Sequence, residues 1–386
     1  MQYKRLVLCL CLFCLFFAPG AFAQDSFLED IPPSIKYLKQ LELKKPPELQ
    51  PENLTPLIRF ALDTQKQESA LPDLDGMSGA FHKFRVPAGI GDIIRYGYNP
   101  RMPAYIFRPA CVRTTEWKNI YSNQGNASLP SLGDKMGRVS ADPMIIQGKE
   151  YEEITPDRNS GAYYGYEQKR TLALFKAQNS TVFISVCLQD EDSSVARKGA
   201  ILGPDTDWNY FYSGEKGINK AGLGWVDSYI YSAFTVTMYV QKPGEKESTG
   251  LCFNWLRAGW MGMNFVKSKH VLAGLKRFTR DVETVFSSPN LPRPQEIIAF
   301  KKRLENCPKE ELAELHQKLF TRACADSEND LVQEHCPEID QGTFSENIER
   351  KYLEARLGLY KFKKWLNKDT LKKDLFEKTA LEQPQN

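Results

Sequence analysis

Histidine is scarce in this chain of 386 residues, and the motifs that surround catalytic histidines are missing. The four histidines lie far apart, and none belongs to HExxH, CxxCH or a Cys/His series with zinc spacing. The sequence also has no GxSxG motif and no phosphate-binding loop of the GxxxxGK[ST] type. Zinc catalysis, serine-hydrolase chemistry of the GxSxG type and nucleotide binding by such a loop are therefore not indicated.

A strong excess of charge of one sign is missing as well. The chain has 51 Lys and Arg residues against 48 Asp and Glu residues, a formal net charge of +3. Loss of Lys4 and Arg5 with a cleaved leader would lower this charge to +1. Proteins that bind nucleic acid usually present a strongly basic face or domain. We therefore expect no nucleic-acid partner.

Long apolar runs are missing after the first residues, and the run that is present there is short. It extends from Leu6 to Ala18, whereas a membrane-spanning helix needs about 20 apolar residues. Two basic residues precede the run, and Ala21-Phe22-Ala23 supplies the small residues of a cleavage site. We predict that residues 1–23 are a cleaved export signal. The mature chain is then periplasmic or secreted, with no transmembrane span. A bacterial envelope and a eukaryotic secretory pathway both fit this signal.

Cysteine is abundant enough to form disulfides after export. Six of the nine cysteines follow residue 23, an even number, and an exported chain meets an oxidising compartment. Cys307 and Cys324 lie at the ends of two successive predicted helices, which would place them roughly 20 Å apart. We therefore predict a Cys307–Cys336 bridge. Cys324 would pair with one cysteine of the preceding region, which contributes Cys111, Cys187 and Cys252.

Proline-rich segments divide the mature chain. Residues 24–80 are predicted to form a proline-punctuated N-terminal arm, and residues 81–286 an α+β domain. The segment Ser287–Pro294 has three prolines and reads as a linker. Residues 295–386 are predicted to form a C-terminal helical domain with helices over 295–306, 309–322, 328–335, 344–366 and 371–381. The expected fold class is α+β, with a mostly antiparallel sheet covered by an amphipathic helix and followed by the helical domain.

One predicted strand and one predicted helix carry the clearest periodicity. The strand SYIYSAFTVTMYV at 228–240 alternates, with Ile230, Phe234, Val236, Met238 and Val240 on one face and mostly Tyr and Thr on the other. A predicted helix over residues 268–286, which Ser268 can cap, carries an apolar stripe, and we expect this stripe to cover the apolar face of the sheet. Gly274 within the stripe would let the helix approach the strands closely. The alternative is an interfacial membrane helix, because the polar face carries the cations Lys267, Lys269, Lys276, Arg277 and Arg280.

An acidic segment, GPDTDWN, is the first candidate site. Asp205, Asp207 and Asn209 stand at the first, third and fifth ligand positions of a calcium loop. Tyr210 stands where such a loop needs Gly, and Lys216 where it needs Glu. The alternative is a turn stabilised by its own side chains with solvated carboxylates. No cofactor is expected unless this loop binds calcium.

Aromatic residues gather around the same segment and form the second candidate site. Their flat faces could bind a glycan, an envelope protein or another amphipathic ligand, unless they belong to the core. The candidates are Trp208, Tyr210, Tyr212, Trp225, Tyr229 and Tyr231. The predicted function is thus a non-catalytic binding or structural interaction module of the envelope. The alternatives are a membrane-surface protein and a hydrolase that uses Asp205, Asp207, Glu152 and Glu153 as acid and base.

Overall fold

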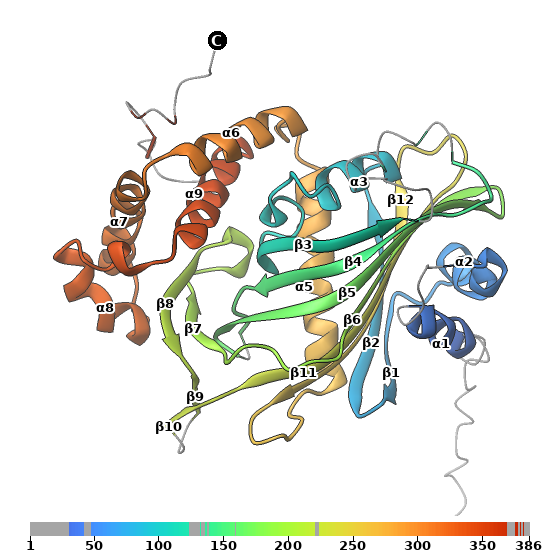
Figure 1. The fold of residues 1–386 in the computed structure, drawn as a ribbon, viewed down its shortest axis with the longest axis horizontal. Coiled ribbons are helices and arrows are strands. Elements are labelled where there is room, and N and C mark those ends of the chain that lie inside the picture. Colours follow the sequence, from blue (N-terminus) through green and yellow to red (C-terminus); the bar gives the residue numbers. More distant parts are fainter. Residues whose placement is uncertain are drawn as a thin grey trace, which may run out of the picture.

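The chain folds around one large antiparallel sheet, which a computed structural model describes for residues 31–41, 48–122, 139–158, 160–220 and 224–368 and a few isolated positions. Eight strands follow one another in the order β1-β2-β12-β11-β6-β5-β4-β3, and β7 and β8 extend the sheet from β5 (Figure 1). Together with the helices, this sheet confirms the predicted α+β class. The strands are β1 Glu68–Leu74, β2 Met77–Val86, β3 Val112–Ser122, β4 Met144–Ile154, β5 Ala162–Ala177, β6 Ser180–Gln189, β7 Arg197–Ile201, β8 Tyr210–Lys216, β11 Tyr229–Gln241 and β12 Ser248–Gly259, with a separate hairpin of β9 Ile218–Lys220 and β10 Gly224–Val226.

Helices lie at both faces and at one end of this sheet. No described helix is both long enough and apolar enough to cross a membrane. The helices are α1 Ile31–Leu41, α2 Thr55–Asp63, α3 Ile90–Gly97, α5 Ser268–Phe286, α6 Pro294–Asn306, α7 Lys309–Asp326, α8 Asp330–Asp340 and α9 Arg350–Trp365, with short 3-10 turns η2 Pro51–Leu54, η3 Ala104–Ile106, η5 Asp205–Asp207 and η6 Ser345–Asn347.

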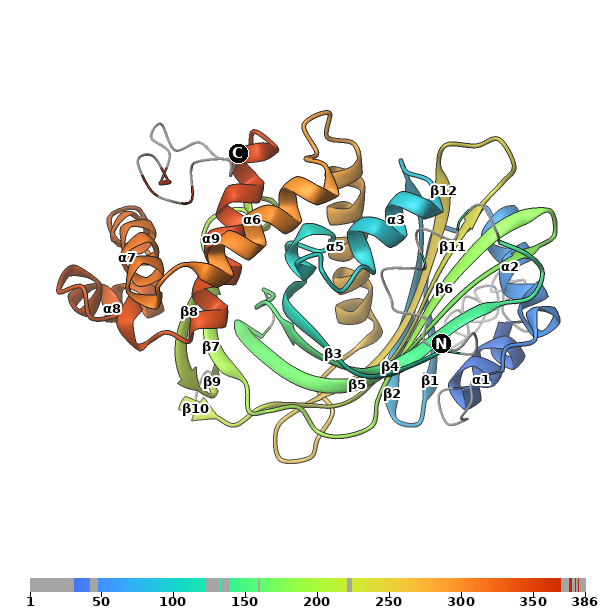
Figure 2. The ribbon, with the colours of Figure 1, turned by 45° about the horizontal axis from the view of Figure 1, so that its top comes forward.

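The predicted N-terminal arm forms a layer on one face of the sheet. The buried side chains of α1 and α2 pack against the apolar face of β11, and Phe60 meets the ring of Phe81 edge to face with 5.2 Å between centroids. Figure 2 shows both helices on the side of the sheet opposite α5. The predicted boundary at residue 80 falls within β2, so the end of the arm is itself part of the sheet.

Helix α5 covers the other face, and its predicted bounds match the structure. Val271, Leu275 and Val282 are buried against Phe84 and Tyr239. The interfacial-helix alternative is therefore wrong, because the stripe that would enter a bilayer lies inside the protein. The expectation that α5 covers the apolar face of the sheet is wrong. Helix α5 covers the Tyr and Thr face of β11, because α1 and α2 occupy the apolar face.

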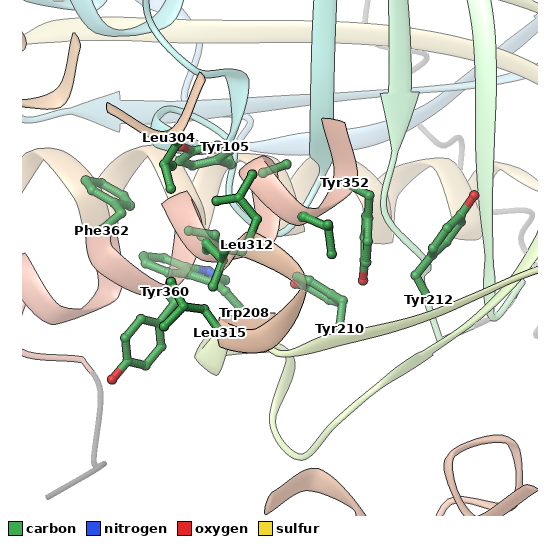
Figure 3. Packing of buried hydrophobic residues seen from close by; sticks show 14 of the residues in the cluster. Tyr105, Trp208, Tyr210, Tyr212, Leu304, Leu312, Leu315, Tyr352, Tyr360 and Phe362 are labelled. Carbon is green, nitrogen blue, oxygen red and sulfur yellow. The ribbon is translucent and has the colours of Figure 1, made fainter. Parts of the chain in front are cut away.

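The C-terminal helices pack onto β7, β8 and η5 and share one core with them. Trp208 and Tyr210 lie in that core beside Leu312 and Phe362, as Figure 3 shows. Helices α6 to α9 confirm the predicted helical region. A further helix predicted for residues 371–381 falls largely outside the described residues, as does the predicted export signal.

The disulfide prediction for this region is wrong. The structure joins Cys324 to Cys336, whose Cα atoms are 5.8 Å apart, and leaves Cys307 as a buried thiol. Only three residues connect α7 to α8, so α8 folds back beside the last turn of α7 and brings Cys336 to Cys324. The extra turn of α7 beyond residue 322 was not expected from the sequence. It carries Cys324 into the helix rather than past its end.

Candidate functional site

A cavity of about 560 Å³ lies between α5 and the sheet. Helix α5 rests directly on β2 and β12. The strands beyond them, β11, β6, β5 and β4, curve around the helix at a greater distance (Figure 2), and their side chains line the cavity. The cavity therefore results from the curvature of the sheet under a straight helix.

Small side chains keep this space open. The strands contribute Ala233, Thr235 and Thr237, and the helix contributes Ala273 and Gly274, both exposed. A Cβ atom added to Gly274 would meet no atom within 4 Å. The structure thus corrects the expectation for Gly274: this residue borders open space at the cavity instead of bringing the helix close to a strand.

Apolar residues form much of the remaining wall. They come from several elements that the sequence separates by more than a hundred residues, and none lies in the predicted aromatic set. They include Val112, Ile154, Leu256, Val271, Leu275 and Phe278, together with Ile230. Ile230 was predicted on the apolar face with Phe234. A register shift between Ile230 and Ser232 interrupts the alternation and places Ile230 at the cavity.

One end of the cavity is ionic. Glu152 lies 3.0 Å from the Nη2 atom of Arg108 and accepts a hydrogen bond of 2.8 Å from the hydroxyl of Tyr166. Arg170 donates from Nε to Glu150 at 2.5 Å and lies 3.6 Å from Glu152. Both carboxylates and Arg170 are almost completely buried. These charges neutralise one another, which makes their burial tolerable.

The ionic partners keep Glu152 in its charged form. Burial alone would raise its pKa, but Arg108 and Arg170 together with the Tyr166 hydroxyl lower that pKa below its ordinary value. A carboxylate held in this way is a poor proton donor. Glu153, its neighbour in the hydrolase hypothesis, points elsewhere and pairs with Arg113 under the C-terminal helices. Glu152 and Glu153 therefore lie in different environments, and the structure does not place them together as an acid and base pair.

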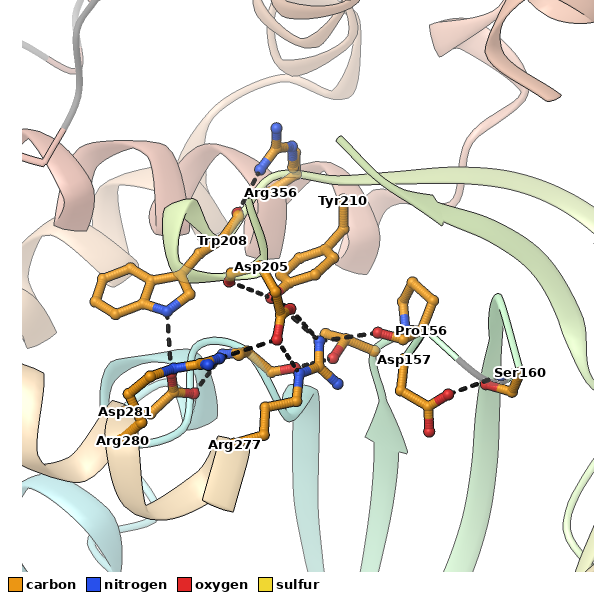
Figure 4. Close-up of polar contacts among 12 residues, drawn as sticks. Pro156, Asp157, Ser160, Asp205, Trp208, Tyr210, Arg277, Arg280, Asp281 and Arg356 are labelled. Carbon is orange, nitrogen blue, oxygen red and sulfur yellow. Dashed lines mark hydrogen bonds and ion pairs between the residues drawn. The ribbon is translucent and has the colours of Figure 1, made fainter. Parts of the chain in front are cut away.

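A second group of charged residues borders the cavity where η5 meets α5. It consists of Asp205, Arg277 and Arg280 (Figure 4). Arg277 binds both carboxylate oxygens of Asp205 at 2.8 and 2.9 Å, and Arg280 binds one of them at 3.0 Å. The hydroxyl of Tyr210 donates to the same carboxylate at 3.0 Å. Burial would raise the pKa of Asp205, but these donors lower it, with Arg277 contributing most.

These contacts change the interpretation of the predicted calcium loop. The two arginines occupy the oxygens of Asp205, and Lys363 donates to the side-chain oxygen of Asn209 at 2.6 Å. Asp207 accepts only a long hydrogen bond of 3.4 Å from Thr206 among the described contacts. In the described part of the chain, no group of three or more His, Cys, Asp or Glu side chains is placed to hold a metal ion. Cations of the protein thus take the place that the sequence suggested for calcium.

The fold places the six predicted aromatic binding residues in different environments. Trp208, Tyr210 and Tyr212 are no more than 2% exposed, so they belong to the core and cannot offer open faces to a ligand. Trp208 stacks on Phe362 at 6.3 Å. Tyr229 and Tyr231 stack on one another at 6.3 Å beside the turn before α5, where the Gly262 N–H donates to the Tyr231 oxygen. For Trp225 the structure gives only the strand, β10.

Three cysteines that were predicted to form disulfides line the cavity instead. Cys187 lies opposite Thr235, and Cys252 lies opposite Thr237, on the two strands that flank β11. Cys111 immediately precedes β3. Burial raises the pKa of Cys252 to about 12 and also raises that of Cys111. These two thiols therefore stay protonated at neutral pH and act as weakly polar parts of the wall.

The sequence did not reveal the ionic end of the cavity. Glu150 and Glu152 alternate along β4, and Gln168 and Arg170 alternate along β5, which is also the pattern of a solvated sheet face. Only the return of α5 across this face, a hundred residues later, makes it interior. The predicted helix over the sheet could have identified the ionic end. If that helix had been assigned to the polar face of the sheet, these charged side chains would have been predicted to be buried.

Comparison with known proteins identifies no family for this chain. No family model matches the sequence, and no curated protein matches it. Among solved structures, the chain is similar to the human StarD13 (DLC2) lipid transfer and protein localization domain, with a TM-score of 0.27 and 10% identity over 62% of this chain and 99% of that chain. A likeness at this level supports no inference about function, which must come from the cavity itself.

Proposed function

We propose that the protein is a non-catalytic binding module that holds a small amphipathic molecule in the cavity under α5. The observation that carries this proposal is the cavity, whose volume of about 560 Å³ lies within the usual range of about 300 to 1,000 Å³ for small-molecule sites. Given the predicted export signal, we place this binding outside the cytoplasm, in the bacterial envelope.

The distribution of polar groups favours a ligand with one polar end. Apolar side chains such as Leu256 and Phe278 would contact a hydrocarbon portion. At the ionic end, about a fifth of the Arg108 side chain is exposed, and among the described residues its only ion-pair partner is Glu152. A guanidinium has five N–H donors, so Arg108 can also bind an oxygen of the ligand.

Gln189, another residue of the cavity wall, has a buried polar atom without a hydrogen-bond partner in the described part of the chain. Gln189 is 1% exposed, and its amide nitrogen donates to the carbonyls of Glu191 and Ile230. Its carboxamide oxygen accepts no hydrogen bond from any described residue. A buried acceptor without a donor costs about 1 to 3 kcal/mol. A hydroxyl or amine of the ligand would satisfy it, which favours a polar amphiphile over a pure hydrocarbon.

Dye binding at the cavity tests the proposal. We expect the amphipathic dye 1-anilinonaphthalene-8-sulfonate to bind the native protein and to be displaced by medium-chain fatty acids or lysophospholipids. Gly274→Trp should close the opening and weaken dye binding about tenfold or more, whereas Gly274→Ala should bind as the wild type does. Circular dichroism and a thermal melt establish that both variants fold. Equal dye affinity in folded Gly274→Trp would overturn the proposal.

A further inference from the structure

The turn between β12 and α5, residues Trp260 to Phe265, presents apolar side chains to solvent. Met261 is 86% exposed, Met263 50% and Phe265 41%. Among the described residues, only two other large hydrophobic side chains are exposed to this degree, Ile120 and Tyr121. The six residues of the 260–265 turn therefore form the most concentrated exposed apolar group of the described chain.

The fold holds this turn in place. Trp260 stacks on Phe265 with 3.8 Å between ring centroids. The side-chain oxygen of Asn264 accepts from the N–H groups of Ala258 and Val266, and its nitrogen donates to the Gly76 carbonyl in the β1–β2 turn. Met261 and Gly262 both have positive φ, which turns the chain sharply. The apolar side chains are thus held outward by a defined framework, and such patches usually mark interaction sites.

The charged residues that flank the turn along the chain are all basic. From Ser248 to Arg280 the sequence contains six Lys or Arg residues and no Asp or Glu. Lys276 pairs with Glu68, and Arg277 and Arg280 pair with Asp205. The three cations nearest the turn form no ion pair among the described residues; they are Arg257, Lys267 and Lys269. In the adjacent β1–β2 turn, Asp75 is already paired with Lys39.

We propose that the 260–265 turn docks on the surface of an anionic lipid bilayer. The exposed Met and Phe side chains would enter the boundary of the acyl chains, and Lys267 and Lys269 would face acidic headgroups. This surface differs from the apolar stripe of α5, which is buried. The inference goes beyond the proposed function and requires no ligand in the cavity.

The size of the patch favours a bilayer over a protein partner. A stable protein interface buries about 800 Å² on each side, which three side chains cannot supply. Attachment to a bilayer needs only a few apolar side chains and neighbouring cations, each cation contributing about 1 kcal/mol. His270, Ala273 and Gly274 line the cavity from the first two turns of α5, which follows the 260–265 turn directly, so docking would bring the cavity opening close to the lipid surface.

Vesicle co-sedimentation tests this inference. We expect the protein to sediment with phosphatidylcholine vesicles that contain phosphatidylglycerol, and much less with phosphatidylcholine alone. Met261→Asp should weaken sedimentation about tenfold or more, because the side chain no longer enters the apolar boundary. Lys267→Ala and Lys269→Ala should each weaken it about fivefold. Ile120→Asp is the matched control, since Ile120 has the same exposure as Phe265 at another place.

The outcomes separate this inference from the proposed ligand cavity. Gly274→Trp should sediment as the wild type does even though it loses dye binding. Failure of the wild type to sediment with phosphatidylglycerol vesicles, or unchanged sedimentation of Met261→Asp, would overturn the docking inference. Equal sedimentation with both lipid compositions would overturn the role of the two lysines.

Discussion

Gly274 shows how a single position can serve the cavity at the expense of stability. A glycine inside a helix costs about 1 kcal/mol relative to alanine. Because an added Cβ at Gly274 meets no atom within 4 Å, we expect Gly274→Ala to raise the free energy of unfolding by about that amount. Urea denaturation measures the change. A loss of stability would mean that the helix approaches a strand here more closely than the structure shows.

Asp281 makes the stability of the protein depend on pH. It accepts hydrogen bonds from the Ala110 N–H at 2.6 Å and from the Trp208 indole at 3.0 Å. Burial raises the pKa of Asp281 to about 7. Below about pH 4 the folded and unfolded chains both carry the proton. As the pH rises to 7, the unfolded chain loses this proton first, so the folded state loses stability.

Asp281→Asn removes this titration, and it also replaces one of the two oxygens that accept from the Ala110 N–H and the Trp208 indole with an NH2 group, which cannot accept. We expect the variant to be less stable than the wild type at pH 5, and the difference to narrow by on the order of 3 kcal/mol at pH 8. Urea denaturation at the two pH values measures both differences. A difference that stays constant with pH would show that Asp281 keeps an ordinary pKa in the folded state, and one that widens would show a lowered pKa.

The chemistry of single residues was the least predictable level. Asp205 was identified as a candidate from its spacing to Asp207, yet its partners Arg277 and Arg280 lie some seventy residues further along the chain. Trp208 was identified by its residue type, but only the packing of α9 decides that it is buried. Residue type and local spacing give the groups that are available, and tertiary contacts decide what each one does.

At the scale of elements, local patterns predicted α5 accurately. Its stripe at helical spacing lies entirely within the helix, so its bounds follow from nearby residues. Its N-terminal cap is Lys267 rather than Ser268, with the Lys267 N–H donating to the His270 ring at 3.3 Å. The face of the sheet that α5 covers could not be predicted, because that choice depends on α1 and α2 occupying the other face.

The bridge between α7 and α8 gives a prediction at the same scale. Cys324 and Cys336 are 12 residues apart, and closing a loop of this length stabilises a fold by about 3 kcal/mol. We expect the double variant Cys324→Ser, Cys336→Ser to lose about that much in urea denaturation. The wild type should lose a similar amount when dithiothreitol is added.

The double variant itself should not respond to dithiothreitol, which provides the control. A non-reduced proteolytic digest analysed by mass spectrometry should contain the Cys324–Cys336 linked peptide. A peptide linking Cys307 to Cys336 would contradict the structure and restore the prediction made from the sequence.

At the scale of the whole molecule, the N-terminal layer is essential to the sheet. Phe60 is completely buried and packs against Phe81 and Phe253. We expect Phe60→Ala to lower the free energy of unfolding by about 3 to 5 kcal/mol. The exposed neighbour Arg59 supplies the control, and Arg59→Ala should change stability little. Equal effects of the two variants would show that the layer is only loosely attached.

The fold class could be predicted from composition and periodicity, but the cavity could not. Alternation along β11 and the stripe of α5 each depend on neighbouring residues, and both are correct over most of their length. The cavity depends on how far β4 and β5 curve away from α5, which involves pairs of strands across the whole sheet. No local pattern in the sequence records that distance.

The strand order has a consequence for how the chain must fold. Strand β2 pairs with β12. The backbone pairing of His82 with Cys252 therefore cannot form until Cys252 has been synthesised, 170 residues later. Until then, the edge of β2 that includes Phe81 has no partner strand. Closure over so long a separation is slow. A protein built in this order exposes the unpaired edge of β2 until its last strand has been synthesised, and during that time the edge is open to pairing with another chain.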